Sequence, residues 1–218
     1  MISAPSSRPT LYKSFKEGQR QFFSKGETII REFEEPRGVY LVDKGFVKVY
    51  GISSEGEENI HTIYGHGDLF PLIWAFRNRT INNVYYKALN DCTIWVMPKS
   101  KFIQHLKVNI DISKAVINQI TEQYYSYIIR IENLERKKAN ERVALFIRYL
   151  GERFGSKFNK QIIINGPFTH QVISDSINLT RESVSKEFEL LKKDGFIKAS
   201  QGEITIINPE KFDQIYSI

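Results

Sequence analysis

The chain has only one cysteine, Cys92, among its 218 residues. One cysteine excludes a disulfide framework, and it excludes a cysteine-ligated iron–sulfur cluster, which needs several thiolates. No run of 18 apolar residues occurs, so no membrane-spanning helix is expected. The first ten residues are rich in serine and proline and have no apolar core. We therefore expect a flexible arm over residues 1–10 of a cytoplasmic protein that has no membrane partner.

Catalytic motifs are also lacking. No Ser/His/Asp array, phosphate-binding loop or paired-carboxylate motif stands out, so the chain is not expected to be an enzyme. One alternative is a cupin-like, metal-dependent barrel enzyme that uses His61 and His66. Such sites usually begin with two histidines one residue apart, which project to the same face of a strand, whereas these two are five apart with Gly65 between them. No metal site is expected.

Residues 169–193 predict a DNA-binding helix-turn-helix. The first helix places Val172, Ile173 and Ile177 on one face, and the second places Val184, Phe188 and Leu191 on one face. Thr169 and Thr180 are suitable N-caps for the two helices. Asn178 tolerates the left-handed backbone that a tight turn needs, and Leu179 is expected to fill the gap between the helices.

The outward residues of the second helix have side chains that suit the major groove. Arg181 can donate to guanine O6 and N7, Glu182 can accept from cytosine N4, and Lys186 can reach a guanine or a phosphate. A carboxylate that faces a polyanion is costly unless it contacts a base, so Glu182 favours base recognition over a merely solvated face. The complete predicted DNA-binding set is Thr169, His170, Gln171, Thr180, Arg181, Glu182, Ser183, Ser185 and Lys186.

Two short strands follow this helix, at 197–200 and 203–207 around Gln201-Gly202, as in the wing of a winged helix-turn-helix. Residues 161–165 can supply a third strand.

Upstream, short apolar or alternating runs punctuated by glycine extend from Gln21 to about Met97, which predicts an antiparallel β-barrel or roll.

Between these parts, residues 110–136 predict one long helix. Its apolar positions alternate in steps of three and four, which is typical of a dimerisation seam: Ile117, Ile120, Tyr124, Tyr127, Ile131 and Leu134. The alternative is that this stripe packs on the β-roll. A two-fold dimer would place two recognition helices about 34 Å apart, so the target would be an inverted repeat in double-stranded DNA.

The order of these parts resembles the cyclic-AMP receptor protein/FNR (CRP/FNR) family of bacterial transcription regulators, over about residues 11–215. The matching strings are residues 38–50, 65–70, 141–144 and 179–186, of which the last is the most specific. The implied fold is α+β. Its expected segments are an arm (1–10), a β-roll sensor domain (11–108), a dimerisation helix (109–138) and a winged helix-turn-helix domain (139–218).

The resemblance places Arg181, Glu182 and Lys186 on the base-reading residues of the family, and Ser185 on a serine that the FNR branch uses. Lys186 stands where the family has an arginine, and a lysine cannot donate the two parallel hydrogen bonds that an arginine makes to guanine. Asn178 stands where the family usually has glycine. The implied function is sequence-specific transcription regulation by a homodimer, with RNA polymerase as a further candidate partner. A protein that keeps this fold for interactions other than DNA binding remains an alternative.

The residues that hold cyclic nucleotides in the family are altered here. The ribose pair corresponds to Gly67-Asp68, the phosphate-binding Arg-Ser pair to Asn82-Asn83, and the adenine-binding pair to Tyr127-Ile128. A cyclic phosphate without a cationic partner loses its strongest contacts, unless Arg77 or Arg79 substitutes for the arginine. The candidate effector-binding residues are Asp68, Arg79, Asn82, Asn83 and Tyr127.

We therefore expect that cyclic AMP is not the effector, that haem is not bound, and that no cofactor is present; the effector is unknown. The apolar segment 70–76 has two interpretations. It can line a pocket for an apolar ligand, or it can pack against the long helix near Tyr124 and Tyr127, which we favour.

Overall fold

The computed structural model describes residues 8–77 and 84–216. The candidate effector residues Arg79, Asn82 and Asn83, and the first seven residues of the expected arm, lie outside this range. Contacts divide the chain into two compact units, one made of 1–57 and 61–126 and the other of 58–60 and 127–218. The unit boundary falls within the long helix α4 (Ile110–Glu135), to which the sequence analysis gave a segment of its own.

The first unit contains the expected β-roll, built as two antiparallel sheets. Their strand orders are β1-β8-β3-β6 and β2-β7-β4-β5. The strands are β1 (Gln19–Phe23), β2 (Thr28–Ile30), β3 (Val39–Lys44), β4 (Val47–Ile52), β5 (Glu58–Tyr64), β6 (Leu69–Phe70), β7 (Tyr85–Ala88) and β8 (Cys92–Met97). The helices α1 (Arg8–Phe15), α2 (Leu72–Phe76) and α3 (Lys99–Val108) accompany them. Since α1 begins at Arg8, the last three residues of the expected arm belong to a helix.

Aromatic rings from both sheets form part of one core of the roll. Phe70 stacks on Tyr40, Tyr64 and Tyr86, with ring centroids 5.1–5.3 Å apart. Stacked rings at this spacing add to the free energy gained from burying their area. The glycine-spaced runs of the sequence thus give short strands with apolar and aromatic side chains turned inward.

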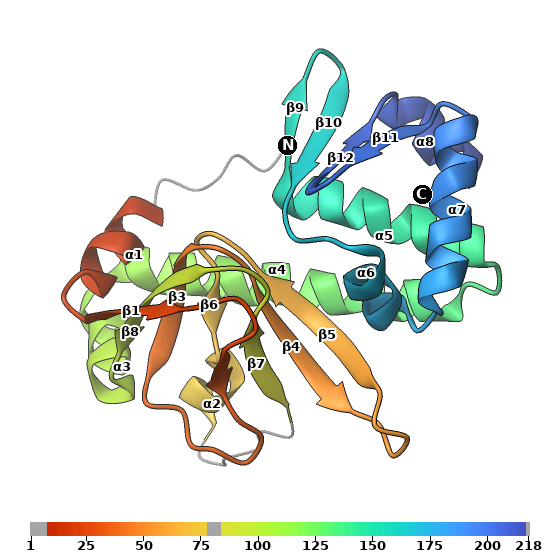
Figure 1. Ribbon diagram of the computed structural model, residues 1–218. Helices are drawn as coiled ribbons and strands as arrows, with labels where there is room; N and C mark the ends of the chain where they lie inside the picture. The colour runs from red at the N-terminus through yellow and green to blue at the C-terminus, as the bar shows by residue number, and fades with distance from the viewer. Residues whose placement is uncertain (1–7, 78–83, 217–218) are drawn as a thin grey trace. The chain divides into compact units, whose positions relative to one another are not determined.

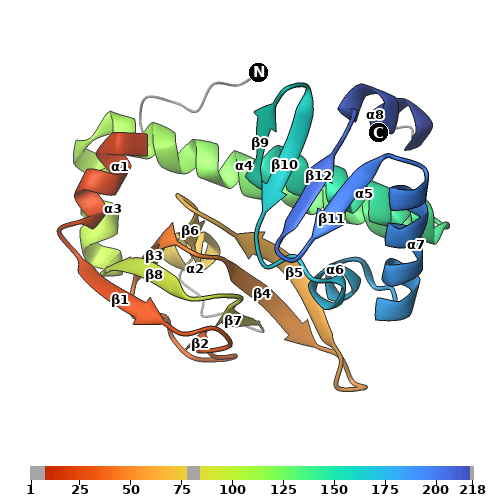
Figure 2. The ribbon, with the colours of Figure 1, turned by 45° about the horizontal axis from the view of Figure 1, so that its top comes forward.

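The segment 70–76 contributes to a second core of this unit. Leu72, Trp74 and Ala75 are buried in one cluster with residues of α1, α3 and the first turns of α4. The packing interpretation is therefore supported, but the buried residues of α4 in this cluster are Ile112, Ala115 and Val116 and not the tyrosines further along. Both views show α1 and α3 beside the N-terminal part of α4 (Figures 1 and 2).

Polar bonds also hold α4 on the roll. The Gln119 side chain donates to the Gly67 carbonyl at 2.9 Å, and that of Gln123 donates to the Leu69 carbonyl at 2.8 Å. A different face of α4 carries the exposed apolar stripe. Among the described helices, none is long and apolar enough to cross a membrane.

The second unit, apart from the end of α4 and residues 58–60, is a winged helix-turn-helix. Helix α5 (Ala139–Phe154) packs on a sheet of order β11-β12-β10-β9, with Gly151 against the side chains of Ile162, Ile164 and Ile206. The strands are β9 (Gly155–Phe158), β10 (Gln161–Asn165), β11 (Ile197–Ser200) and β12 (Glu203–Ile206), and the other helices are α6 (His170–Ile177), α7 (Arg181–Lys193) and α8 (Pro209–Tyr216). The predicted wing and third strand are confirmed, while β9 and α8 were not predicted.

Candidate nucleic-acid interface

The local sequence fixes the two helices of the motif as predicted. The Thr169 side chain accepts a hydrogen bond from the Val172 amide at 3.2 Å, and the Thr180 side chain accepts one from the Ser183 amide at 3.1 Å. Between the helices, Asn178 has φ 50° and ψ 53°, the left-handed conformation expected for the turn. Both N-caps and the turn therefore have the predicted geometry.

Apolar packing anchors α7 along its inner face. Val184, Phe188 and Leu191 are each no more than 2% exposed, and so are Ile173 and Ile177 of α6. Val172 and Leu179 are only partly buried, so they contribute less than the helical pattern indicated. Deleting a buried phenylalanine side chain costs about 3–5 kcal/mol, and anchoring of this kind fixes which face of α7 points outward.

Two arginines outside the motif hold the end of α6. Arg142 of α5 donates to the Ile177 carbonyl, and Arg130 of α4 donates to the Ser176 carbonyl. Burial is the main cause that lowers the pKa of both guanidinium groups, although both stay charged near neutral pH. Helix α6 has no basic residue in its own last turn, so these cations face its negative end. Sequence reasoning missed this role and gave Arg142 only as part of a family string.

The outer face of α7 presents three charged side chains at its N-terminal end. Arg181, Glu182 and Lys186 are exposed, and none forms a hydrogen bond or an ion pair with a residue that the structure describes. Ser185 is partly buried on the same helix. An anchored helix with unpaired donors and an acceptor at its first turns has the chemistry that contacts base edges in the major groove.

Several other predicted DNA-binding residues have local roles. Thr169, Thr180 and Ser183 take part in the caps, with the Thr180 and Ser183 hydroxyls 2.9 Å apart. The Gln171 side chain donates to the Asp175 carboxylate at 2.6 Å. Such residues can still meet phosphates through the helix N-terminus, which is a positioning role.

His170 packs against the core of the motif, with its ring centroid 4.6 Å from that of Phe188. Burial, with smaller contributions from Lys192 and Arg181, lowers the pKa of the imidazole below its ordinary value of 6.5. The imidazole is therefore neutral at pH 7, and it can donate one hydrogen bond and accept another.

Two candidate effector residues, Asp68 and Tyr127, lie within the described range, and neither side chain is fully exposed. The buried Asp68 carboxylate accepts from the Gly65 amide at 2.8 Å, and the Asp68 amide donates to the Gly65 carbonyl at 3.0 Å. The carboxylate therefore closes the turn between β5 and β6. Tyr127 is partly buried on α4.

Neither histidine of the enzyme alternative belongs to a metal cluster. His66 lies beside Tyr12, with its Nδ1 2.7 Å from the Asp43 carbonyl oxygen. Over residues 8–77 and 84–216, no group of three or more His, Cys, Asp or Glu side chains is arranged to hold a metal ion.

Comparison with known proteins gives two matches to family models. Residues 20–109 match the cyclic nucleotide-binding domain, and residues 141–215 match the Crp-like helix-turn-helix domain. The two matches lie on either side of α4. They agree with the β-roll and the winged helix-turn-helix described above.

Individual relatives are similar to nearly the whole chain. The global nitrogen regulator of Synechococcus elongatus is 22% identical, with 100% of both chains covered. The cAMP-activated global transcriptional regulator CRP of Pasteurella multocida is 25% identical over 94% of this chain and 98% of the relative. A solved structure of a CooA mutant from Carboxydothermus hydrogenoformans has a TM-score of 0.78 at 20% identity, covering 99% of this chain and 98% of the other, and it shows the fold alone.

The exposed outer face of α7, the order of β-roll, long helix and winged helix-turn-helix, and the two domain matches agree with one another. They give no support to a metal-dependent barrel. The chain belongs to the CRP/FNR family of transcription regulators, with a helix-turn-helix DNA-binding domain.

Proposed function

We propose that the chain binds an inverted repeat in DNA as a homodimer and reads each half-site with Arg181, Glu182, Ser185 and Lys186. The observation that carries this proposal is the outer face of α7, where three charged side chains are exposed and have no hydrogen bond or ion pair with a described residue, on a helix whose inner face is buried. Glu182 restricts which DNA half-sites can be bound, because a carboxylate near the phosphates is favourable only where it accepts a hydrogen bond from a base such as cytosine.

The proposed dimer forms through the exposed stripe of α4. Ile117, Tyr124 and Ile131 are 61%, 67% and 57% exposed, and Ile120 and Leu134 are 42% and 39% exposed. Tyr127 is partly buried on the same helix. A seam between two chains would bury these side chains further; the gain is about 1.5–3 kcal/mol for a fully exposed aliphatic side chain that becomes fully buried, and it is smaller for side chains that are already partly buried. The face of α4 that packs on the roll is a different one, so both uses of the helix are compatible.

We further propose that cyclic AMP is not the effector. The position that the family uses for its phosphate-binding arginine is Asn82, and Asp68 uses its carboxylate in its own turn. Without a cation at that position the cyclic phosphate loses a charge-assisted hydrogen bond, which is about twice as strong as a neutral one. The lost phosphate contact agrees with a regulator that has no small-molecule effector and whose activity is set by the abundance of the protein itself.

The proposal is tested by fluorescence anisotropy of the ligand-free protein on a duplex with a TGTGA-type inverted repeat and on a scrambled duplex, at one salt concentration. We expect at least a thousandfold preference for the repeat, as specific complexes of this kind show. A calorimetric titration should give no micromolar cyclic-AMP binding. Stoichiometric micromolar binding would contradict the effector part and leave the DNA part standing.

A protein that keeps the fold without reading DNA is the second candidate, and no observation favours it. Arg181→Ala separates the two functions. A regulator loses affinity and base preference at one position, whereas an interaction protein shows no preference among DNA sequences to lose.

A further inference from the structure

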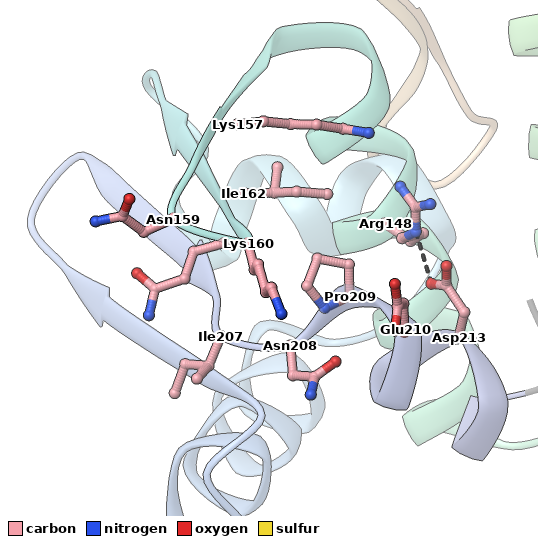
Figure 3. Close-up of a pocket in the computed structure, with 11 residues that line it drawn as sticks. Arg148, Lys157, Asn159, Lys160, Ile162, Ile207, Asn208, Pro209, Glu210 and Asp213 are labelled. Atoms are coloured by element: carbon pink, nitrogen blue, oxygen red, sulfur yellow. Dashed lines mark hydrogen bonds and ion pairs between the residues drawn. The ribbon is translucent and has the colours of Figure 1, made fainter. Parts of the chain in front are cut away.

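The second unit contains a cavity, lined by both polar and apolar side chains, that the proposed DNA binding does not use. Its volume is about 620 Å³, within the range of small-molecule sites. Its walls come from α5, the β9–β10 hairpin, the segment that follows β12, and α8 (Figure 3). No lining residue belongs to α6 or α7, so an occupant would not displace DNA from the recognition helix.

The cavity has two unpaired cations on its hairpin side. The side chains of Lys157 and Lys160 form no hydrogen bond, ion pair or ring contact with any residue in the described parts of the chain. In Figure 3, Lys160 points toward Asn208 and Pro209, and Lys157 extends above Ile162 at the top of the view. Two unpaired ammonium groups beside one cavity favour an anion.

The opposite wall carries one guanidinium group, of Arg148, and two carboxylates, of Glu210 and Asp213. Arg148 pairs with the Asp213 carboxylate at 2.6 Å and with that of Glu152 at 3.2 Å. Asn208 accepts from the Lys211 amide at 3.0 Å through its side-chain oxygen, which leaves its amide nitrogen able to donate to a ligand. Glu210 lines the same wall and can accept from a hydroxyl group.

The hairpin turn puts a lysine where the backbone favours glycine. Phe158 pairs with Gln161, so Asn159 and Lys160 form a two-residue turn, with φ values of 46° and 62°. Turns of this kind favour Asn-Gly, because glycine adopts positive φ without steric cost. A lysine at the glycine position is strained, and such strain is common at binding sites, where the side chain has a role.

We propose that this cavity binds a small multivalent anion that carries phosphate or carboxylate groups. Lys157 and Lys160 neutralise its charge, Asn208 donates a hydrogen bond, and Glu210 accepts from a hydroxyl where the ligand has one. The site is independent of DNA binding, and its test needs no DNA.

The test is calorimetric titration of the full chain at low salt with two probes, inorganic pyrophosphate and citrate. We expect saturable binding of at least one probe with one site per chain. Pyrophosphate alone assigns a phosphate ligand, and citrate alone assigns a carboxylate ligand. Absence of saturable binding by both probes would overturn the proposal.

Three variants locate the site. Lys160→Gly and Lys157→Gln should each weaken binding at least tenfold, whereas Lys193→Gln, which removes an exposed charge at the end of α7, should leave it unchanged. Glycine also relieves the positive φ, so the melting temperature of Lys160→Gly should stay the same or rise. Wild-type binding by Lys160→Gly would overturn the proposal, and so would weaker binding with a lower melting temperature, because Lys160 would then serve the fold.

Discussion

Arg181→Ala should separate DNA recognition from stability in one variant. The Arg181 side chain is exposed and has no hydrogen bond or ion pair with a described residue, so its removal leaves no buried group unpaired. It is also the first residue of α7, where a positive charge faces the positive end of the helix dipole. We therefore expect the free energy of unfolding to change by less than about 0.5 kcal/mol, and the melting temperature to stay the same or rise slightly.

The effect on DNA should be much larger. Loss of a bidentate contact to guanine costs about 1–3 kcal/mol, which is about 5- to 140-fold in affinity for one half-site. If both half-sites of a dimer are read, the two losses add to about 2–6 kcal/mol. On scrambled DNA the loss should be smaller, because only a general electrostatic contribution remains.

Fluorescence anisotropy on the repeat and on scrambled DNA, together with thermal unfolding, measures both quantities. Lys193→Ala is the matched control, since it removes an exposed charge from the other end of the same helix. The reasoning is refuted if Arg181→Ala weakens both duplexes equally, or if it lowers the melting temperature along with the affinity.

Three further changes test other parts of the structure. Ile120→Asp places a charge in the exposed stripe of α4 and should convert the dimer to a monomer in analytical ultracentrifugation, with loss of affinity for the repeat; a dimer that persists would contradict the seam. Because burial lowers the pKa of His170 in the folded state, stability should be fully present above pH 6.5 and fall below it, and His170→Gln should lose less stability between pH 6.5 and 5; identical pH profiles would contradict this. Burial raises the pKa of the Cys92 thiol to about 11, so a thiol reagent at pH 8 should modify it only after unfolding, and rapid modification of the native protein would contradict this burial.

Local interactions made much of the interface predictable. Thr169 and Thr180 cap their helices within three residues, and Asn178 forms the turn through its own backbone preference. The spacing of Val184, Phe188 and Leu191 fixes the inner face of α7 and hence the outer one. Each of these features depends on short-range periodicity or on a cap, which the sequence displays directly.

The features that sequence reasoning missed depend on contacts between distant residues. Arg142 reaches the end of α6 across 35 positions, and no spacing rule indicates that pair. Strand β9 has no apolar alternation, and its pairing depends on the left-handed turn at Asn159 and Lys160. Sequence reasoning gave no role to Lys160 of that turn, which the fold places beside the cavity.

Asp68 illustrates the limit of reasoning from a family. The resemblance placed it in the effector site, whereas its carboxylate oxygen accepts from the Gly65 amide three residues earlier. A short Gly-x-Gly-Asp string is also a turn signature, and Asp commonly bonds to backbone amides in turns. Its role toward an effector remains a prediction.

The central claim is that an unliganded dimer reads an inverted repeat through α7. Anisotropy of the wild-type protein on three duplexes of equal length, with the repeat, one half-site and a scrambled sequence, tests it most directly at a fixed salt concentration. We predict tight binding to the repeat, much weaker binding to the half-site, and only weak, salt-dependent binding to the scrambled duplex. Equal affinity for all three duplexes would contradict the claim.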